Sequence, residues 1–173
     1  MEAETFWRIV EAAKNASYGD CQRQARLVTD ALSELGPDEV LAFERILDDL
    51  VDEAYRWDLW GAADLINRGC SDDGFRDFRG WLIAQGQDVY RNALGDPDSL
   101  ADHPAVASLG EFDILWCQDL LAASLPAYEK LTGGDPPEDQ RPPAVLQGAR
   151  WDFDDETIMR RRYPRLWALV RSQ

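Results

Sequence analysis

Histidine and cysteine are scarce in this chain, which has one histidine, His103, and three cysteines, Cys21, Cys70 and Cys117, among 173 residues. Zinc sites need clusters of Cys and His ligands, and no two of these cysteines have CxxC spacing, so neither a metal nor a cofactor is expected. A cysteine nucleophile needs a nearby base, and nothing in the sequence supports a pairing of Cys70 with His103. An odd cysteine count without motif spacing predicts free thiols in a reducing cytoplasm.

Basic residues are also few, since 18 lysines and arginines face 33 aspartates and glutamates, which gives a net charge of −15. Such a surplus repels nucleic-acid backbones and anionic lipid, so neither direct nucleic-acid binding nor membrane binding is expected. The basic run Arg160–Arg162 follows Asp154–Glu156, and Glu156 precedes Arg160 by one helical turn. That order favours ion pairs on a helix, which predicts a charged surface helix rather than a nucleic-acid patch.

Long apolar runs, a secretory signal and a glycine-rich phosphate loop are missing as well. No segment approaches the roughly 20 apolar residues of a membrane-spanning helix. The acidic start MEAETFWRIVEAAK lacks the basic residues that open a signal peptide. The sequence therefore predicts a soluble, cytoplasmic protein.

Alternating β-branched runs of strand length are absent, whereas apolar residues recur at helical spacing along nearly the whole chain. The sequence predicts an all-α fold, a compact single-domain bundle of about seven to nine helices, several of them short. The clearest helix starts at GPDEV, where Gly36 is the cap and Pro37 takes the first helical position. Val40, Phe43 and Leu47 then lie on one face of it.

Three regions follow from the distribution of proline and glycine. We expect a helical body over residues 1–131, an exposed connection over 132–143, and a C-terminal helical segment over 144–173 that docks on the body. The connection, TGGDPPEDQRPP, contains four prolines, so it cannot be the interior of a helix. Within the body, a helix over Phe112–Leu131 would have apolar residues on almost every side, which predicts that this stretch is one continuous, central and buried helix.

The stretch WDLWGAADLINRGCSDDGF, residues 57–75, is dense in tryptophan, aspartate and glycine. Apolar residues at helical spacing predict a helix over Trp57–Asn67, which Gly69 would end by taking a left-handed conformation. Ser71 is expected to cap a second helix that reaches about Gln85. The two helices would then meet at a tight corner.

Glycines inside both helices indicate close packing at this corner. A glycine in a helix costs up to about 1 kcal/mol relative to alanine, so Gly61 and Gly80 predict the close approach of another element. We expect Trp60 and Phe78 to be substantially buried there.

One face of the first helix carries Trp57, Trp60, Asp64 and Asn67 at positions i, i+3, i+7 and i+10, apart from its aliphatic stripe. This face is a candidate wall of a binding site. The full set of candidate binding residues adds polar side chains around the corner: Trp57, Asp58, Trp60, Asp64, Asn67, Asp72, Asp73 and Arg76. No catalytic residue is assigned.

Two other interpretations of the same residues stay open. In the structural one, the tryptophans fill the core, Asp72 and Asp73 satisfy the helix dipole, and Asp64 bonds an indole or an arginine. In the catalytic one, Asp58, Asp64, Asp72 and Asp73 converge on a hard cation such as Mg²⁺ or Ca²⁺, which prefers oxygen ligands.

Three segments carry a resemblance to a known family: FWRIVEAA near the start, AYRWDLWGAADLINRGCSDDGFRDFRGWLIAQGQDVY from Ala54 to Tyr90, and DPDSLA after it. They resemble the bacterial domain-of-unknown-function family number 4240 over residues 1 to about 131. The resemblance implies a bacterial, intracellular domain that occurs alone or beside other modules such as WGR-type domains. It implies no established activity and assigns no residue a catalytic role.

The acidic surface favours an interaction module that binds a protein partner, with a basic partner attracted by the charge. An immunity or regulatory protein is one version of this hypothesis. The alternative is a carboxylate-based, metal-assisted hydrolase that uses Asp58, Asp64, Asp72 and Asp73. The sequence favours the first over an enzyme and makes no prediction of the oligomeric state.

Overall fold

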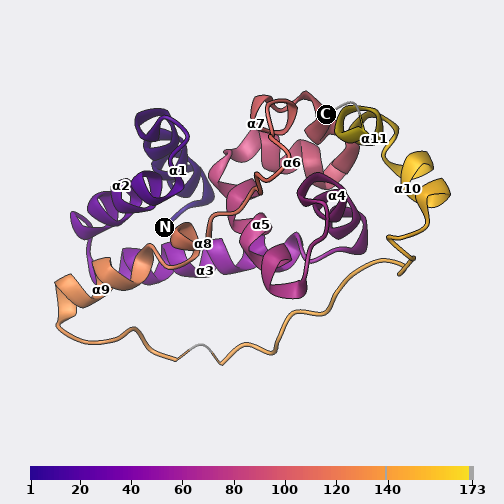
Figure 1. Cartoon of the computed structure of the whole chain (residues 1–173). Helices are drawn as coiled ribbons and strands as arrows, with labels where there is room; N and C mark the ends of the chain where they lie inside the picture. The colour runs from indigo at the N-terminus through magenta and orange to yellow at the C-terminus, as the bar shows by residue number, and fades with distance from the viewer. Residues whose placement is uncertain (139, 172–173) are drawn as a thin grey trace.

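The computed structural model describes residues 1–138 and 140–171 of the chain, and these form helices joined by turns and one long connection (Figure 1). No strand occurs among the described residues, so the all-α prediction is confirmed. Nine of the helices in this part have seven or more residues. In chain order the helices are α1 (Ala3–Ser17), α2 (Cys21–Ser33), α3 (Pro37–Glu53), α4 (Trp57–Asn67), α5 (Asp72–Ala84), α6 (Gln87–Gly95), the 3₁₀ helix η1 (Pro97–Asp102), α7 (Pro104–Ala107), α8 (Gln118–Leu121), α9 (Ser124–Thr132), α10 (Glu156–Arg162) and α11 (Pro164–Arg171).

Helices α2 and α3 begin where local capping chemistry favours a helix start. The Asp20 carboxylate accepts a hydrogen bond from the backbone N–H of Arg23 at 2.9 Å and caps α2. Gly36 is the extended cap of α3 and Pro37 its first residue. Because the missing N–H of proline would be unpaired at that position anyway, α3 loses no hydrogen bond there.

Helix α5 is the central element of the fold. It contacts α1, α2, α3, α4, α6 and α8, and Figure 1 shows it in the middle of the molecule. Phe78 is fully buried on it, as predicted, whereas Trp60 on α4 is only half-buried. The guanidinium of Arg79 is also buried, and it donates to the carbonyl of Val51 at 2.8 Å, so α5 is fastened to α3.

The prediction of one continuous helix over Phe112–Leu131 is wrong. The segment before α8 is not helical, Phe112 is 89% exposed, and α8 and α9 are separate short helices. Pro126 gives the reason for the second break, because it has no N–H to bond the carbonyl of Ala122. The apolar residues of this stretch belong to a non-helical segment and two short helices, not to one buried helix.

The prediction of free thiols is also wrong for two of the three cysteines. Cys21, at the start of α2, and Cys117, just before α8, form a disulfide bond with a Cα–Cα distance of 5.7 Å. Their separation of 96 residues along the chain concealed that the fold brings them together. Closing a loop of that size stabilises the folded state by about 4 to 5 kcal/mol in the chain-entropy model. Cys70 is the free cysteine.

After α9 the chain runs along the outside of the molecule before it returns at α10 (Figure 1). Arg141 fastens this connection to α3 through Asp48 at 2.8 Å and Asp49 at 2.7 Å. Gln147 then exchanges backbone hydrogen bonds with Tyr55 and Trp57, each at 2.9 Å. The connection is therefore extended but held at two points.

Helices α10 and α11 pack on the body, where α11 contacts α4 and η1. The carboxylate of Asp98, buried in η1, accepts hydrogen bonds from the backbone N–H groups of Arg165 and Leu166 at 3.0 and 2.9 Å. It thereby satisfies donors in the first turn of α11 that have no partner inside the helix. Among the described residues, no helix is both long and apolar enough to cross a bilayer.

Candidate functional site

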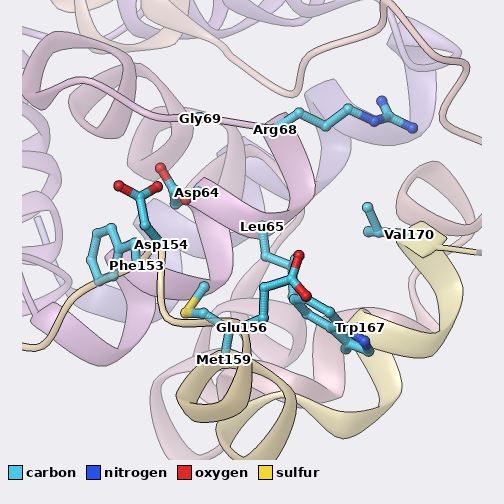
Figure 2. A pocket seen from close by; sticks show the side chains of 10 residues that line it. All are labelled: Asp64, Leu65, Arg68, Gly69, Phe153, Asp154, Glu156, Met159, Trp167 and Val170. Atoms are coloured by element: carbon cyan, nitrogen blue, oxygen red, sulfur yellow. The ribbon is translucent and has the colours of Figure 1, made fainter.

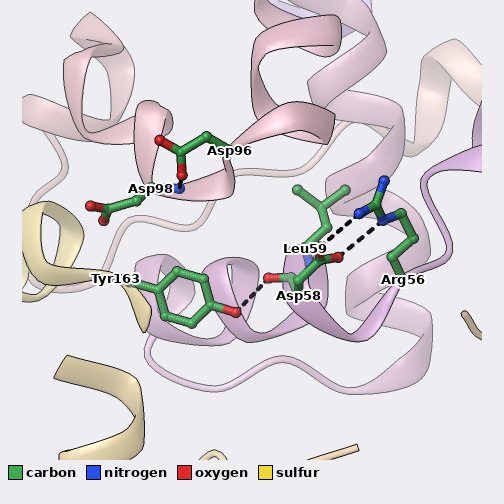
Figure 3. Close-up of polar contacts among 6 residues, drawn as sticks. All are labelled: Arg56, Asp58, Leu59, Asp96, Asp98 and Tyr163. Atoms are coloured by element: carbon green, nitrogen blue, oxygen red, sulfur yellow. Dashed lines mark hydrogen bonds and ion pairs between the residues drawn. The ribbon is translucent and has the colours of Figure 1, made fainter. Parts of the chain in front are cut away.

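Helix α4 has the bounds that the sequence predicts, Trp57–Asn67. Asp58 stabilises its first turn by accepting from the backbone N–H of Leu59 at 2.9 Å, and it forms a two-point ion pair with Arg56 (Figure 3). At the other end, Arg68 takes the left-handed conformation with φ 55°, and Gly69 follows at φ 119°. The left-handed stop is thus one residue earlier than predicted.

The two faces of α4 have separate roles. Leu59, Ala62, Ala63 and Ile66 are buried in the core. The opposite face presents Trp57, Trp60 and Asp64 to a groove, so the division into an aliphatic and an aromatic face is as predicted.

Aromatic rings form the floor of this groove. Trp57 and Trp60 stack with ring centroids 5.4 Å apart, and Trp60 stacks in turn on Phe75 of α5 at 5.0 Å. The indole N–H of Trp60 donates to the carbonyl of Cys70 at 2.8 Å. The ring of Phe153 meets Trp57 edge-on at 5.8 Å. These contacts fix the rings, so the groove is built before any ligand enters.

The second wall of the groove comes from the segment that precedes α10. The groove has a volume of about 810 Å³. Its lining consists of Trp57, Trp60, Asp64 and Cys70 on one side and Arg150, Trp151, Asp152, Phe153 and Asp154 on the other. Sequence reasoning missed the second wall because it lies far along the chain. The alternation of aromatic and acidic residues in WDFDD was the available signal.

A second pocket of about 450 Å³ adjoins the groove and shares Asp64, Phe153 and Asp154 with it. Figure 2 shows the carboxyl groups of Asp64 and Asp154 beside each other, with Phe153 next to them. Glu156 and Trp167 lie at the far side of this pocket. The two cavities together form a continuous acidic and aromatic depression.

The electrostatics of the depression centre on Asp64. Partial burial raises the pKa of its carboxyl group, the backbone N–H of Cys70 at 2.9 Å lowers it, and the negative charge of Asp154 raises it again. The result is a pKa above the ordinary value for aspartate. A cation placed between these two carboxyl groups would relieve their repulsion.

The environment of Cys70 disfavours the thiolate form that a cysteine nucleophile needs. Burial raises the pKa of its thiol to about 12, and the charge of Asp64 adds to that shift, so the thiol stays protonated at neutral pH. His103 lies against Trp81, near the other end of α5, and its Nδ1 accepts from the backbone N–H of Ala105 at 3.3 Å. The considered pairing of Cys70 with His103 is not observed.

The other sequence candidates lie outside the groove. Asn67 bonds Leu115, Asp72 accepts from the hydroxyl of Tyr55 at 3.0 Å, and Asp73 and Arg76 are exposed on α5. Of the eight candidates, Trp57, Trp60 and Asp64 therefore come together in the groove.

The predicted convergence of Asp58, Asp64, Asp72 and Asp73 on a cation is not observed. Within residues 1–138 and 140–171, no group of three or more His, Cys, Asp or Glu side chains is placed to hold a metal ion. The reason is that Asp58, Asp64 and Asp72 accept hydrogen bonds from different local partners, at the two ends of α4 and the start of α5.

Comparison with known protein families gives a match for most of the chain. A family model described as "Protein of unknown function (DUF4240)" matches residues 1–130. No curated protein and no solved structure matches the chain. The α4 wall of the groove lies inside the matched region, and the wall formed by residues 150–154 lies outside it.

Proposed function

The chain belongs to the DUF4240 family, and from this premise we propose that it is a protein-interaction module whose groove binds a lysine or arginine side chain of a basic partner. The observation that carries the proposal is the combination in one groove of fixed aromatic faces with the carboxyl groups of Asp64, Asp152 and Asp154.

Charge supports a cationic ligand. Asp64, Asp152 and Asp154 outnumber the one basic residue of the groove lining, Arg150, and the whole chain has a net charge of −15. The protein field attracts a basic partner over a distance of about a Debye length. The carboxyl groups of the groove would then select a cationic side chain at short range.

The aromatic rings support it as well, because they already hold arginines of the chain itself. The guanidinium of Arg150 lies 5.5 Å from the centroid of the Trp57 ring, and that of Arg162 lies 3.8 Å from the centroid of Trp151. A cation over an aromatic face gains about 0.5 to 2 kcal/mol, depending on its desolvation. Arg150 is exposed, so an incoming cation can replace it over Trp57.

The size of the depression favours a peptide segment over a single small ion. Two adjoining cavities of about 810 and 450 Å³ offer consecutive subsites that share Asp64 and Asp154. A segment with two basic residues close in sequence would place one side chain in each.

Calorimetric titration with a defined peptide tests the proposal. The probe is an octapeptide of alternating arginine and glycine, and its control replaces arginine by citrulline, which keeps the shape and removes the charge. We expect the arginine peptide to bind at low salt, and the citrulline peptide to bind roughly tenfold or more weakly, because a charged hydrogen bond contributes about 1.5 to 3 kcal/mol. Arg150→Gln should tighten binding, since it removes a competing cation.

Matched variants distinguish binding by the groove from nonspecific attraction by the net charge of the protein. Asp64→Asn with Asp154→Asn should weaken binding about tenfold, whereas Asp30→Asn with Asp135→Asn, two exposed sites that change the net charge equally, should leave it nearly unchanged. Equal loss in both double variants, or no difference between the two peptides, would show that the groove does not select cations.

A second candidate function is hydrolysis by a carboxyl pair, favoured by the raised pKa of Asp64 beside Asp154. A carboxyl group with a raised pKa can donate a proton while a neighbouring carboxyl group accepts one in the same reaction. A screen of chromogenic glycosides and esters with wild type and Asp64→Asn tests it. Turnover that persists in Asp64→Asn would assign the activity elsewhere.

A further inference from the structure

The segment just before α8 exposes a row of large apolar side chains. Phe112 is 89% exposed, Ile114 57% and Trp116 43%, whereas the alternate residues Leu115 and Cys117 are buried. From Ile114 to Cys117 this period of two is the mark of an extended chain with one inward and one outward face. Phe112 lies in the turn just before this stretch, where the N–H of Asp113 donates to the carbonyl of Gly110 at 3.2 Å. We call Phe112, Ile114 and Trp116 the apolar row.

The inner edge of the segment is hydrogen-bonded to the body of the fold at Leu115 and Cys117. The side-chain amide of Asn67 accepts from the N–H of Leu115 at 2.9 Å and donates to its carbonyl at 3.1 Å. The N–H of Cys117 donates to the carbonyl of Asp77 on α5 at 3.0 Å, and the disulfide bond with Cys21 fixes the same residue covalently. The segment is therefore held in its extended form before any partner binds.

The outer edge is open. The backbone groups of alternate residues in an extended chain point to opposite edges, so the N–H groups of Ile114 and Trp116 point away from Asn67. Neither N–H has a hydrogen-bond partner in the part of the chain that the structure describes. An edge of unpaired donors beside exposed apolar side chains is a template for a further strand.

We propose that residues 112–116 form a docking edge for an extended segment of a partner protein in which apolar residues alternate with lysine or arginine. The partner strand would pair with the backbone of Ile114 and Trp116 and pack its apolar side chains on the apolar row, as in β-strand addition. Its basic residues would face Glu111 and Asp113, which are exposed in the same segment.

The negative charge of the segment favours a basic partner strand over a second copy of this chain. Two copies paired edge to edge would bring Glu111 and Asp113 of each close together, and each copy has a net charge of −15. Like charges opposite one another destabilise strand pairs. The docking edge is independent of the aromatic groove, which is built from α4 and residues 150–154.

The test uses an acetylated and amidated heptapeptide in which lysine alternates with valine and isoleucine, with binding measured by calorimetry and hydrogen exchange. We expect the peptide to bind and to protect the amide protons of Ile114 and Trp116 from exchange. A peptide of the same composition, with its lysines in one block, should bind about tenfold more weakly because its apolar side chains no longer share one face.

Protein variants locate the contact. Phe112→Ser with Ile114→Ser should weaken binding about tenfold, whereas Tyr18→Ser with Val145→Ser, which removes two exposed large side chains elsewhere, should not change it. Asp64→Asn with Asp154→Asn should leave the protection of the Ile114 and Trp116 amides unchanged, because it removes only binding of the peptide in the groove, so failure here is distinguishable from failure of the groove proposal. Binding without protection of the two amides, equal weakening by both serine pairs, or dimerisation of the free chain through residues 112–116 in sedimentation would each overturn the proposal.

Discussion

Asn67 and Leu115 are joined by two hydrogen bonds, in which the side-chain amide of Asn67 accepts from the N–H of Leu115 at 2.9 Å and donates to its carbonyl at 3.1 Å. The last residue of α4 thus holds a segment 48 residues further along the chain. The sequence indicated Asn67 as a candidate binding residue, and the structure gives it an internal partner.

Asn67→Ala should therefore lower the free energy of unfolding by about 1 to 3 kcal/mol, because it leaves the polar groups of a largely buried residue unpaired. Asn15→Ala is the matched control, since Asn15 is exposed in the last turn of α1, and it should be neutral or slightly stabilising. Urea denaturation followed by circular dichroism measures both. Equal stability of the two variants would contradict the role of Asn67.

Gly61→Ala should destabilise the fold although alanine is the better helix former. An added Cβ would lie 2.5 Å from the hydroxyl of Tyr163 and 2.9 Å from Cζ2 of Trp151. Overpacking of this kind costs about 1 to 3 kcal/mol, more than the gain of up to about 1 kcal/mol in helix propensity.

The same tyrosine supplies a coupling test, because its hydroxyl also donates to the carbonyl of Asp58 at 2.5 Å (Figure 3). Tyr163→Phe loses this hydrogen bond but opens space beside Gly61. The double variant should be more stable than the sum of the single effects by roughly 0.5 to 2 kcal/mol. Simple additivity would show that the two residues do not crowd each other.

Gly80→Ala should be more damaging than Gly61→Ala. Its Cβ would lie 2.5 Å from the backbone carbonyl oxygen of Cys117, and a backbone atom fixed by a disulfide cannot turn aside as a side chain can. Gly95→Ala is the control, since nothing lies within 4 Å of the added atom. Thermal melting should show a lower Tm for Gly80→Ala and an unchanged or higher Tm for Gly95→Ala.

Cys21→Ser with Cys117→Ser should lower the free energy of unfolding by about 2 to 5 kcal/mol, the usual effect of removing a native disulfide. Cys70→Ser should change it less, because Cys70 is a free, half-buried thiol. Intact-mass measurement before and after reduction identifies the bond. Titration of three free thiols in the native protein under non-reducing conditions would refute it.

Asp64 should contribute to the pH dependence of stability, so that wild type and Asp64→Asn differ in it. Its pKa is raised in the folded state by burial and by Asp154, so folding favours the protonated form, and this contribution is complete below the unfolded pKa of about 3.9. The contribution is lost as pH rises through the raised pKa. Asp64→Asn should therefore stabilise the protein at pH 7 relative to wild type, and the advantage should shrink toward acid pH in urea titrations. A constant difference across the pH range would contradict the raised pKa.

Local chemistry made several helices predictable from the sequence. Pro37 and Ser71 mark helix starts through backbone effects that act within one turn, and the bounds Trp57–Asn67 followed from spacing alone. The sequence also predicted that another element approaches Gly61 and Gly80 closely, as the structure shows. Their partners were not, because Tyr163 and Cys117 reach them only through the tertiary fold.

The features that sequence patterns could not give are those set by distant contacts. The pairing of Cys21 with Cys117 and the second wall of the groove around Trp151 both depend on segments that meet across the chain. The apolar pattern of Phe112–Leu131 fits a buried helix as well as an exposed extended segment followed by two short helices. Spacing alone does not distinguish the two when apolar residues lie on every side.

The tether between α9 and α10 sets how firmly the C-terminal helices hold α4. Because residues 133–155 join them covalently, docking of α10 and α11 is an intramolecular event at an effective concentration of the order of 1 mM. A contact that would have a Kd of about 10 μM between separate molecules would then be about 99% closed. Severing the chain within 133–146 would turn the groove from a permanent feature into one that assembles only when both pieces are concentrated.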